Sequence, residues 1–84
     1  MTERLSRLAD IEKGTKVRIN SVEGGHGCIT RLNRFGLYPG DLARVVRRAP
    51  FGGPVLLEVR GMEIALGRSL ARCILVEVTV CDSL

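Results

Sequence analysis

The chain has 84 residues, of which 45% are apolar and 26% charged, a balance typical of one small globular domain. Its net charge of +4 suits an anionic partner, although such a charge also serves solubility alone. No stretch approaches the roughly 20 apolar residues of a membrane helix, and the N-terminus lacks a signal peptide's apolar segment. We therefore expect a single cytoplasmic domain over residues 1–84, without membrane insertion and with a short tail at residues 81–84.

The N-terminal part of the chain predicts a lid followed by a strand. Leu5, Leu8 and Ile11 recur at intervals of three, which gives a helical turn or an irregular segment one apolar side. Residues 1–13 are therefore expected to lie across one end of the fold. Lys16 to Val22 then alternates apolar and polar side chains, which predicts a strand with one face in water.

A helix of about two turns is predicted from Cys28 to Phe35, with Ile29 and Leu32 facing the core. Gly36 follows at the place where a left-handed residue commonly ends a helix. Tyr38 to Asp41 then reads Tyr-Pro-Gly-Asp, in which the Pro-Gly pair indicates a type II turn.

The rest of the chain predicts strands separated by glycine and proline turns. The strands are Leu42 to Arg48, Val55 to Arg60, Met62 to Leu66 and Cys73 to Val80. Ser69 is expected to cap one helical turn through Arg72. Five short strands bury an interior and protect their edges best when the sheet curls into a barrel. The predicted fold is an all-β, SH3-like barrel of about five strands, with a short helix after the first strand and a helical turn before the last.

A glycine cluster lies between the first predicted strand and the helix, where backbone amides can hold an anion. A Walker-type phosphate loop would place Lys and then Ser or Thr after its last glycine, but Cys28 follows Gly27. The spacing also fails the dinucleotide-binding pattern. Gly24, Gly25 and Gly27, together with Gly36, are therefore interpreted as residues that shape the backbone at a tight corner.

His26 and Cys28 are candidate ligands for Fe²⁺ or Zn²⁺, because imidazole and thiolate both coordinate such ions. Structural zinc sites normally bring two closely spaced pairs, and here there is one. A small buried role for Cys28 and a metal bridge between molecules through His26 are the alternatives. Cys28, Cys73 and Cys81 are expected to be free thiols, because no secretory signal precedes them.

Enzymatic activity and nucleic-acid binding are not expected. A lone histidine and scattered carboxylates make neither a catalytic triad nor a carboxylate pair. One basic surface would form if the predicted helix packed beside the strand Leu42 to Arg48, from Arg31, Arg34, Arg44, Arg47 and Arg48. Nucleic-acid-binding barrels usually add exposed aromatic rings on which bases stack, and aromatic residues are scarce in this chain.

Several segments of the chain form a specific combination: the L-x-x-I-x-x-G pattern that ends at Gly14, the strand VRINSV, the block GGHGCITRLNRFGLYPG, the region LARVVRRAPFGGPVLLEVRG and the closing MEIALGRSLARCILV. In combination they resemble the FeoA family, the small cytosolic components of bacterial ferrous-iron uptake. The resemblance covers nearly the whole chain.

The resemblance implies an SH3-like barrel that acts as an accessory or regulator of FeoB, the membrane ferrous-iron transporter with a cytosolic GTPase region. The candidate contact residues are His26, Arg31, Arg34, Tyr38 and Phe51. Arg31 or Arg34 is also a candidate to stabilise phosphoryl transfer in trans. A homodimer is left open.

The same barrel is similar to the C-terminal domain of metal-dependent repressors of the DtxR type. The alternative function is therefore a metal-responsive regulatory module that binds a metal or a transcriptional regulator. We expect the transport role instead, because the chain shows neither the winged helix nor the dimerisation domain of those repressors.

Overall fold

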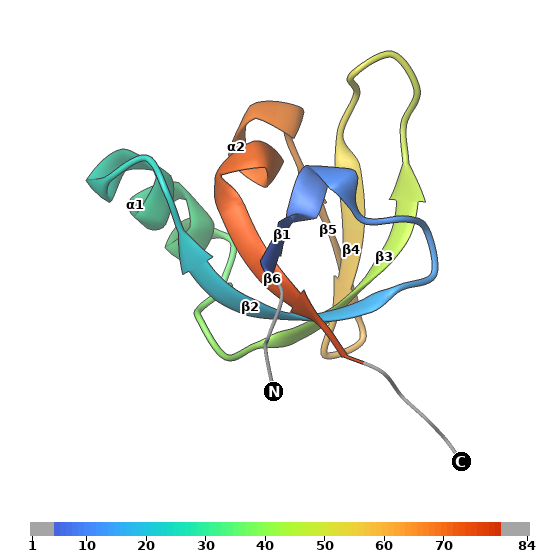
Figure 1. Cartoon of the computed structure of the whole chain (residues 1–84), viewed down its shortest axis with the longest axis horizontal. Helices are drawn as coiled ribbons and strands as arrows, with labels where there is room; N and C mark the ends of the chain where they lie inside the picture. Colours follow the sequence, from blue (N-terminus) through green and yellow to red (C-terminus); the bar gives the residue numbers. More distant parts are fainter. Residues whose placement is uncertain (1–4, 80–84) are drawn as a thin grey trace.

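The computed structural model describes residues 5–79. Within them, six antiparallel strands form one sheet in the order β1-β6-β2-β3-β4-β5 (Figure 1). The strands are β1 (Leu5–Arg7), β2 (Lys16–Val22), β3 (Leu42–Arg48), β4 (Val55–Val59), β5 (Met62–Leu66) and β6 (Ile74–Val78). The helices are α1 (His26–Arg34), α2 (Arg68–Cys73) and a 3-10 helix at Leu8–Asp10. In this part of the chain no helix is long and apolar enough to cross a membrane.

Two bulges bend the sheet around its interior. In β2 the register against β6 shifts between Ile19 and Ser21, and in β3 the register against β4 shifts between Val45 and Arg47. An extra residue in one strand bends that strand and increases its twist. The result is the curled, mostly β, SH3-like fold that the sequence predicts, so the predicted fold class is confirmed.

The core is aliphatic, as expected for a chain with few aromatic residues. Its fully or nearly buried members are Leu8, Ala9, Ile11, Val17, Ile19, Leu32, Leu37, Ala43, Val45, Val55, Leu57, Val59, Leu66, Leu70, Ala71, Ile74 and Val76. On β4 the buried residues alternate with partly exposed ones, which is the period of a strand with one face inward. Burying one such Val, Leu or Ile side chain stabilises by about 1.5 to 3 kcal/mol.

The N-terminal segment differs from its prediction. Residues 1–13 are expected to be a lid without a strand, but Leu5–Arg7 forms β1 and pairs with β6, which gives six strands rather than five. Three residues are too few for an alternating pattern to be visible. Leu8 and Ile11 are buried as the apolar spacing indicates, whereas Leu5 is exposed.

The C-terminal helix and strand also begin at other residues than predicted. Gly67 is the N-cap of α2, without a side-chain cap, so the prediction that Ser69 caps this helix is wrong. Arg68 instead donates to the carbonyl oxygens of Gly53 and Ala49, which ties α2 to the hairpin between β3 and β4.

The last strand, predicted over Cys73 to Val80, is β6 at Ile74–Val78. Cys73 belongs to α2, because the helix runs one residue beyond Arg72, where the predicted helical turn ends. Val80 and the predicted tail lie outside the described residues.

Candidate functional site

α1 lies at one side of the barrel next to α2 (Figure 1). Its inward side consists of Leu32, which is fully buried, and the partly buried Cys28. Residues four apart share a helix face, and Cys28 faces α2. Ile29 is 40% exposed. The prediction that Ile29 and Leu32 both face the core is therefore correct for Leu32 and wrong for Ile29.

The glycines around α1 shape the chain at its two ends. Gly24 and Gly25 have φ values of 98° and 84° where the chain turns from β2 into α1, and Gly36 has a φ of 82° just after the helix. A residue with a β-carbon adopts this left-handed region only with strain. Gly27 lies inside α1, where an added β-carbon would meet open space, so steric demands do not require glycine there.

The outward side of α1 carries three of the predicted contact residues. His26 and Arg34 are eight residues apart, two intervals of four, and so share one face. Arg31 precedes Arg34 by three residues and is its neighbour on the helix. The side chains of Ile29 and Phe35 are 40% and 41% exposed. This exposed set, termed the α1 surface, consists of His26, Ile29, Arg31, Arg34, Phe35 and Tyr38.

Tyr38 lies in the turn beyond α1 and is half exposed. Its backbone N–H donates to Oδ2 of Asp41 at 2.9 Å, and the N–H of Asp41 donates back to the Tyr38 carbonyl at 3.0 Å. Gly40 has a φ of 97°, so the predicted turn is confirmed. Arg60 donates to the Gly36 carbonyl and to Asp41, which ties this segment to the turn between β4 and β5.

The side chains of Arg31 and Arg34 have no interaction partner within the described part of the protein. Among the residues that the structure describes, neither forms an ion pair or a side-chain hydrogen bond. Six other arginines have partners: Arg7 with Glu23, Arg18 with Glu77, Arg44 with Glu58, Arg48 with the Ala9 carbonyl, Arg60 with Asp41 and Arg68 with the Ala49 carbonyl. Both arginines lie in the last turn of α1, where a positive charge interacts favourably with the helix dipole. Their guanidinium groups remain available to a partner.

The conditional basic surface of the sequence analysis does not form. α1 packs beside α2, and Figure 1 shows α1 and the C-terminal end of β3 on opposite sides of the molecule. Arg44 pairs with Glu58 at 2.6 Å, and Arg48 donates to the Ala9 carbonyl at 2.8 Å. The arginines of β3 are therefore separated from those of α1.

Phe51 is also remote from α1. It lies in the loop of the β3–β4 hairpin, which rises on the other side of the molecule (Figure 1). Its side chain is fully exposed and its φ is 60°, a conformation that costs a bulky residue on the order of 1 kcal/mol or more. The structure therefore does not bring Phe51 together with the α1 surface.

A shallow depression of about 370 Å³ lies on another part of the barrel. Its lining residues are Lys16, Leu42, Ala43, Arg44, Glu58, Arg60, Gly61 and Thr79. Because Arg44 and Arg60 are already paired with Glu58 and Asp41, their charges are largely compensated within the protein. The depression is a rival docking surface that experiments can separate from the α1 surface.

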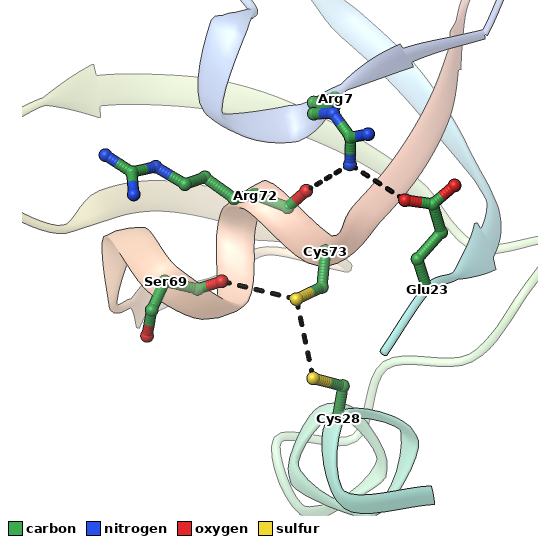
Figure 2. A network of polar contacts seen from close by, with 6 residues as sticks. All are labelled: Arg7, Glu23, Cys28, Ser69, Arg72 and Cys73. Atoms are coloured by element: carbon green, nitrogen blue, oxygen red, sulfur yellow. Dashed lines mark hydrogen bonds and ion pairs between the residues drawn. The ribbon is translucent and has the colours of Figure 1, made fainter. Parts of the chain in front are cut away.

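Two thiols meet at the junction of α1 and α2 (Figure 2). Sγ of Cys28 is 3.4 Å from Sγ of Cys73, and the Cys73 thiol donates to the Ser69 carbonyl at 3.5 Å. The expectation of free thiols is confirmed for both residues, while Cys81 lies outside the described residues. The hydrogen bond with Cys28 and partial burial raise the pKa of the Cys73 thiol. No local sequence pattern pairs these two cysteines, because they are 45 residues apart along the chain.

His26 does not join the thiol pair. Residues two apart on a helix point in different directions, so with Cys28 facing Cys73 the exposed His26 faces solvent. Within residues 5–79, no three His, Cys, Asp or Glu side chains are grouped so that they could hold a metal ion. The two candidate ligands of the sequence analysis thus do not converge on one position.

Similarity to known proteins shows the family to which this chain belongs. The family model of the FeoA domain matches residues 6–78. The chain belongs to the FeoA family. A protein of Methanocaldococcus jannaschii, provisionally named Fe(2+) transport protein A, is 36% identical over 70 residues that cover 83% of each chain. FeoA proteins are accessory proteins of ferrous-iron transport and are not a known enzyme family.

Solved structures of similar proteins have the same fold as this chain. A FeoA-like protein from Clostridium acetobutylicum has a TM-score of 0.84 at 27% identity, covering 100% of this chain and 96% of that one. A manganese-dependent transcriptional repressor has a TM-score of 0.83 at 18% identity, covering 94% of this chain and 44% of the repressor. The second likeness shows the fold alone. It agrees with the likeness to repressor C-terminal domains that the sequence implies.

Proposed function

We propose that this FeoA protein is a cytoplasmic accessory protein that docks through its α1 surface on the cytosolic GTPase region of a FeoB-type ferrous-iron transporter. The observation that carries the proposal is the pair of unpartnered arginines, Arg31 and Arg34, beside the half-exposed side chains of Ile29 and Phe35. Arginine and aromatic residues are enriched in protein interfaces. Membership of the FeoA family supports the choice of a ferrous-iron transporter as the partner.

The charge arrangement favours α1 over the β3 side of the barrel. A carboxylate on a partner that paired with Arg44 would have to replace Glu58, which already lies at 2.6 Å. On β3 only Arg47 lacks an intramolecular partner among the described residues, whereas α1 presents two such arginines, Arg31 and Arg34. A new charge-assisted hydrogen bond to either of these replaces only water. Complementary charge mainly sets the association rate and the choice of partner. The α1 surface therefore suits an acidic patch with an apolar centre.

Capture of the purified GTPase region by immobilised protein tests the proposal. We expect Arg31→Ala combined with Arg34→Ala to weaken the affinity about tenfold or more, because arginines at the centre of an interface each contribute on the order of 1 kcal/mol or more. The measurement is the dissociation constant at low and at high salt.

The matched control is Arg44→Ala combined with Arg47→Ala, which removes the same charge from β3. This control is expected to bind within a few-fold of wild type. The proposal fails if wild type captures nothing, or if both double variants lose affinity equally, because the second result would indicate a general charge effect. Affinity for the GTPase region that survives high salt supports the docking proposal, whereas phosphate-driven binding to a nucleic acid would fall steeply with ionic strength.

GTP turnover by the transporter's cytosolic domain tests a catalytic role for the same arginines. An arginine supplied in trans stabilises the charge that develops during phosphoryl transfer. We expect wild type to raise the turnover rate and the Arg31→Ala, Arg34→Ala variant to raise it much less, at protein concentrations that saturate binding. An unchanged rate with saturating wild type would remove the catalytic role and leave the docking proposal standing.

A further inference from the structure

The contact between Cys28 and Cys73 joins two helices that are distant in the sequence. Figure 2 shows the two side chains pointing toward one another from α1 and from the end of α2, with their sulfur atoms 3.4 Å apart. Both residues are partly exposed. A β-carbon added to Gly24 would lie 3.0 Å from the Cys28 sulfur and 3.5 Å from the Cys73 sulfur, so the backbone closes one side of the pair.

We infer that Cys28 and Cys73 form a redox modification site, in which a peroxide converts the two thiols into a disulfide that joins α1 to α2. A disulfide bond is about 2.05 Å long, so the sulfur atoms must approach by about 1.4 Å from their present separation. Rotation of the side chains and a small shift of α1 supply this movement. Leu32 is the only residue of α1 that is buried in the core, which leaves the helix room to adjust.

One molecule of hydrogen peroxide accepts the two electrons that the two thiols lose when the disulfide forms. One cysteine, as its thiolate, attacks the O–O bond of hydrogen peroxide, which gives a sulfenic acid and releases hydroxide. The second cysteine attacks the sulfenic sulfur, forms the S–S bond and expels the oxygen as hydroxide. In total the two thiols lose two protons and two electrons, and hydrogen peroxide is reduced to two molecules of water.

The surroundings of Cys73 affect the rate of this reaction. The hydrogen bond with Cys28 and partial burial raise the pKa of the Cys73 thiol, Arg7 on β1 opposes the rise, and Glu23 after β2 adds to it. Figure 2 shows Arg7 bridging Glu23 and the Arg72 carbonyl beside the thiol. Because the thiolate is the reactive form, disulfide formation should become faster as the pH is raised above neutral.

The disulfide would restrain the position of α1. Its two ends are 45 residues apart in the sequence, and a crosslink over such a loop restricts the unfolded chain substantially. It would also fix the orientation of the α1 surface. This last consequence rests on the proposed function, whereas formation of the disulfide does not.

The test uses the full chain with Cys81→Ser, so that the third thiol cannot take part. The reduced protein is treated with stoichiometric hydrogen peroxide, the remaining thiols are alkylated, and the intact mass and melting temperature are measured. We expect a mass lower by two hydrogen atoms, no alkylation at Cys28 or Cys73, and a melting temperature raised by about 10 °C or more. A thiol reductant should reverse all three changes.

The control adds Cys28→Ser to the same background. It should give circular dichroism like that of its parent and show no peroxide-dependent rise in melting temperature. The inference is overturned if both thiols of the parent stay open to alkylation while glutathione in the same solution is oxidised. It is also overturned if the crosslink joins two molecules. No transporter is present, so either failure is distinct from failure of the docking proposal.

Discussion

Leu32→Ala is expected to destabilise the protein by about 2 to 5 kcal/mol, the usual cost of removing a large side chain from a packed core. Leu32 is fully buried and is the only residue of α1 that is buried in the core. Small domains have a total stability of only about 5 to 15 kcal/mol, so the loss is a large fraction of it. Urea unfolding followed by far-UV circular dichroism measures the difference.

Ile29→Ala is the matched control, because it removes an aliphatic side chain of similar size from the same helix. Ile29 is 40% exposed, so its truncation should cost about 1 kcal/mol or less. Equal losses for the two variants would contradict the orientation of α1 described above. They would instead favour the sequence prediction in which both residues face the core.

Gly24→Ala is expected to destabilise the protein by about 2 to 3 kcal/mol, from two additive causes. The φ of Gly24 is 98°, which a residue with a β-carbon adopts only with strain. The new β-carbon would also lie 3.0 Å from the sulfur of Cys28, so the thiol pair would have to move. Thermal and urea unfolding of the reduced protein measure the loss.

Gly27→Ala provides the comparison for this glycine. Gly27 lies within α1, and an added β-carbon would meet no atom within 4 Å. Alanine is a better helix former than glycine by up to about 1 kcal/mol, so this variant should be as stable as wild type or more stable. A destabilisation at Gly27 that matches the one at Gly24 would contradict the assignment of backbone strain and close packing to Gly24 alone of these two residues.

The strands could be predicted well because each has a strong local signal. β3 and β5 have the predicted bounds, since alternating apolar residues lie between turns that contain glycine or proline. β1 has only three residues and gains its stability from pairing with β6. That pairing is a tertiary contact, and no local pattern reports it.

The candidate site was less predictable, because it depends on how α1 is seated. The sequence gives Ile29 and Leu32 equal standing as inward residues, and contact with α2 decides that Cys28 accompanies Leu32 instead. The proximity of Cys28 and Cys73 follows from the same contact. The one sequence signal for this contact is that Cys28 begins the predicted helix and Cys73 begins the predicted last strand.

Which arginines have intramolecular partners also could not be predicted from the sequence. Sequence position alone does not distinguish Arg34, which no neighbour uses, from Arg44, which pairs with Glu58. The cross-strand register that places Arg44 opposite Glu58 becomes apparent only when β3 and β4 are aligned. Among the described residues, α1 has two arginines without an intramolecular partner, Arg31 and Arg34, whereas β3 has one, Arg47.

The location of the docking surface is tested most directly by NMR titration of the ¹⁵N-labelled protein with the transporter's cytosolic GTPase region. We expect the largest amide shift changes to fall within residues 26–38, and Arg31→Ala with Arg34→Ala to remove them while the fold is retained. Changes centred on the depression beside Leu42 and Arg44, on the hairpin that carries Phe51, or nowhere in the protein would contradict this expectation.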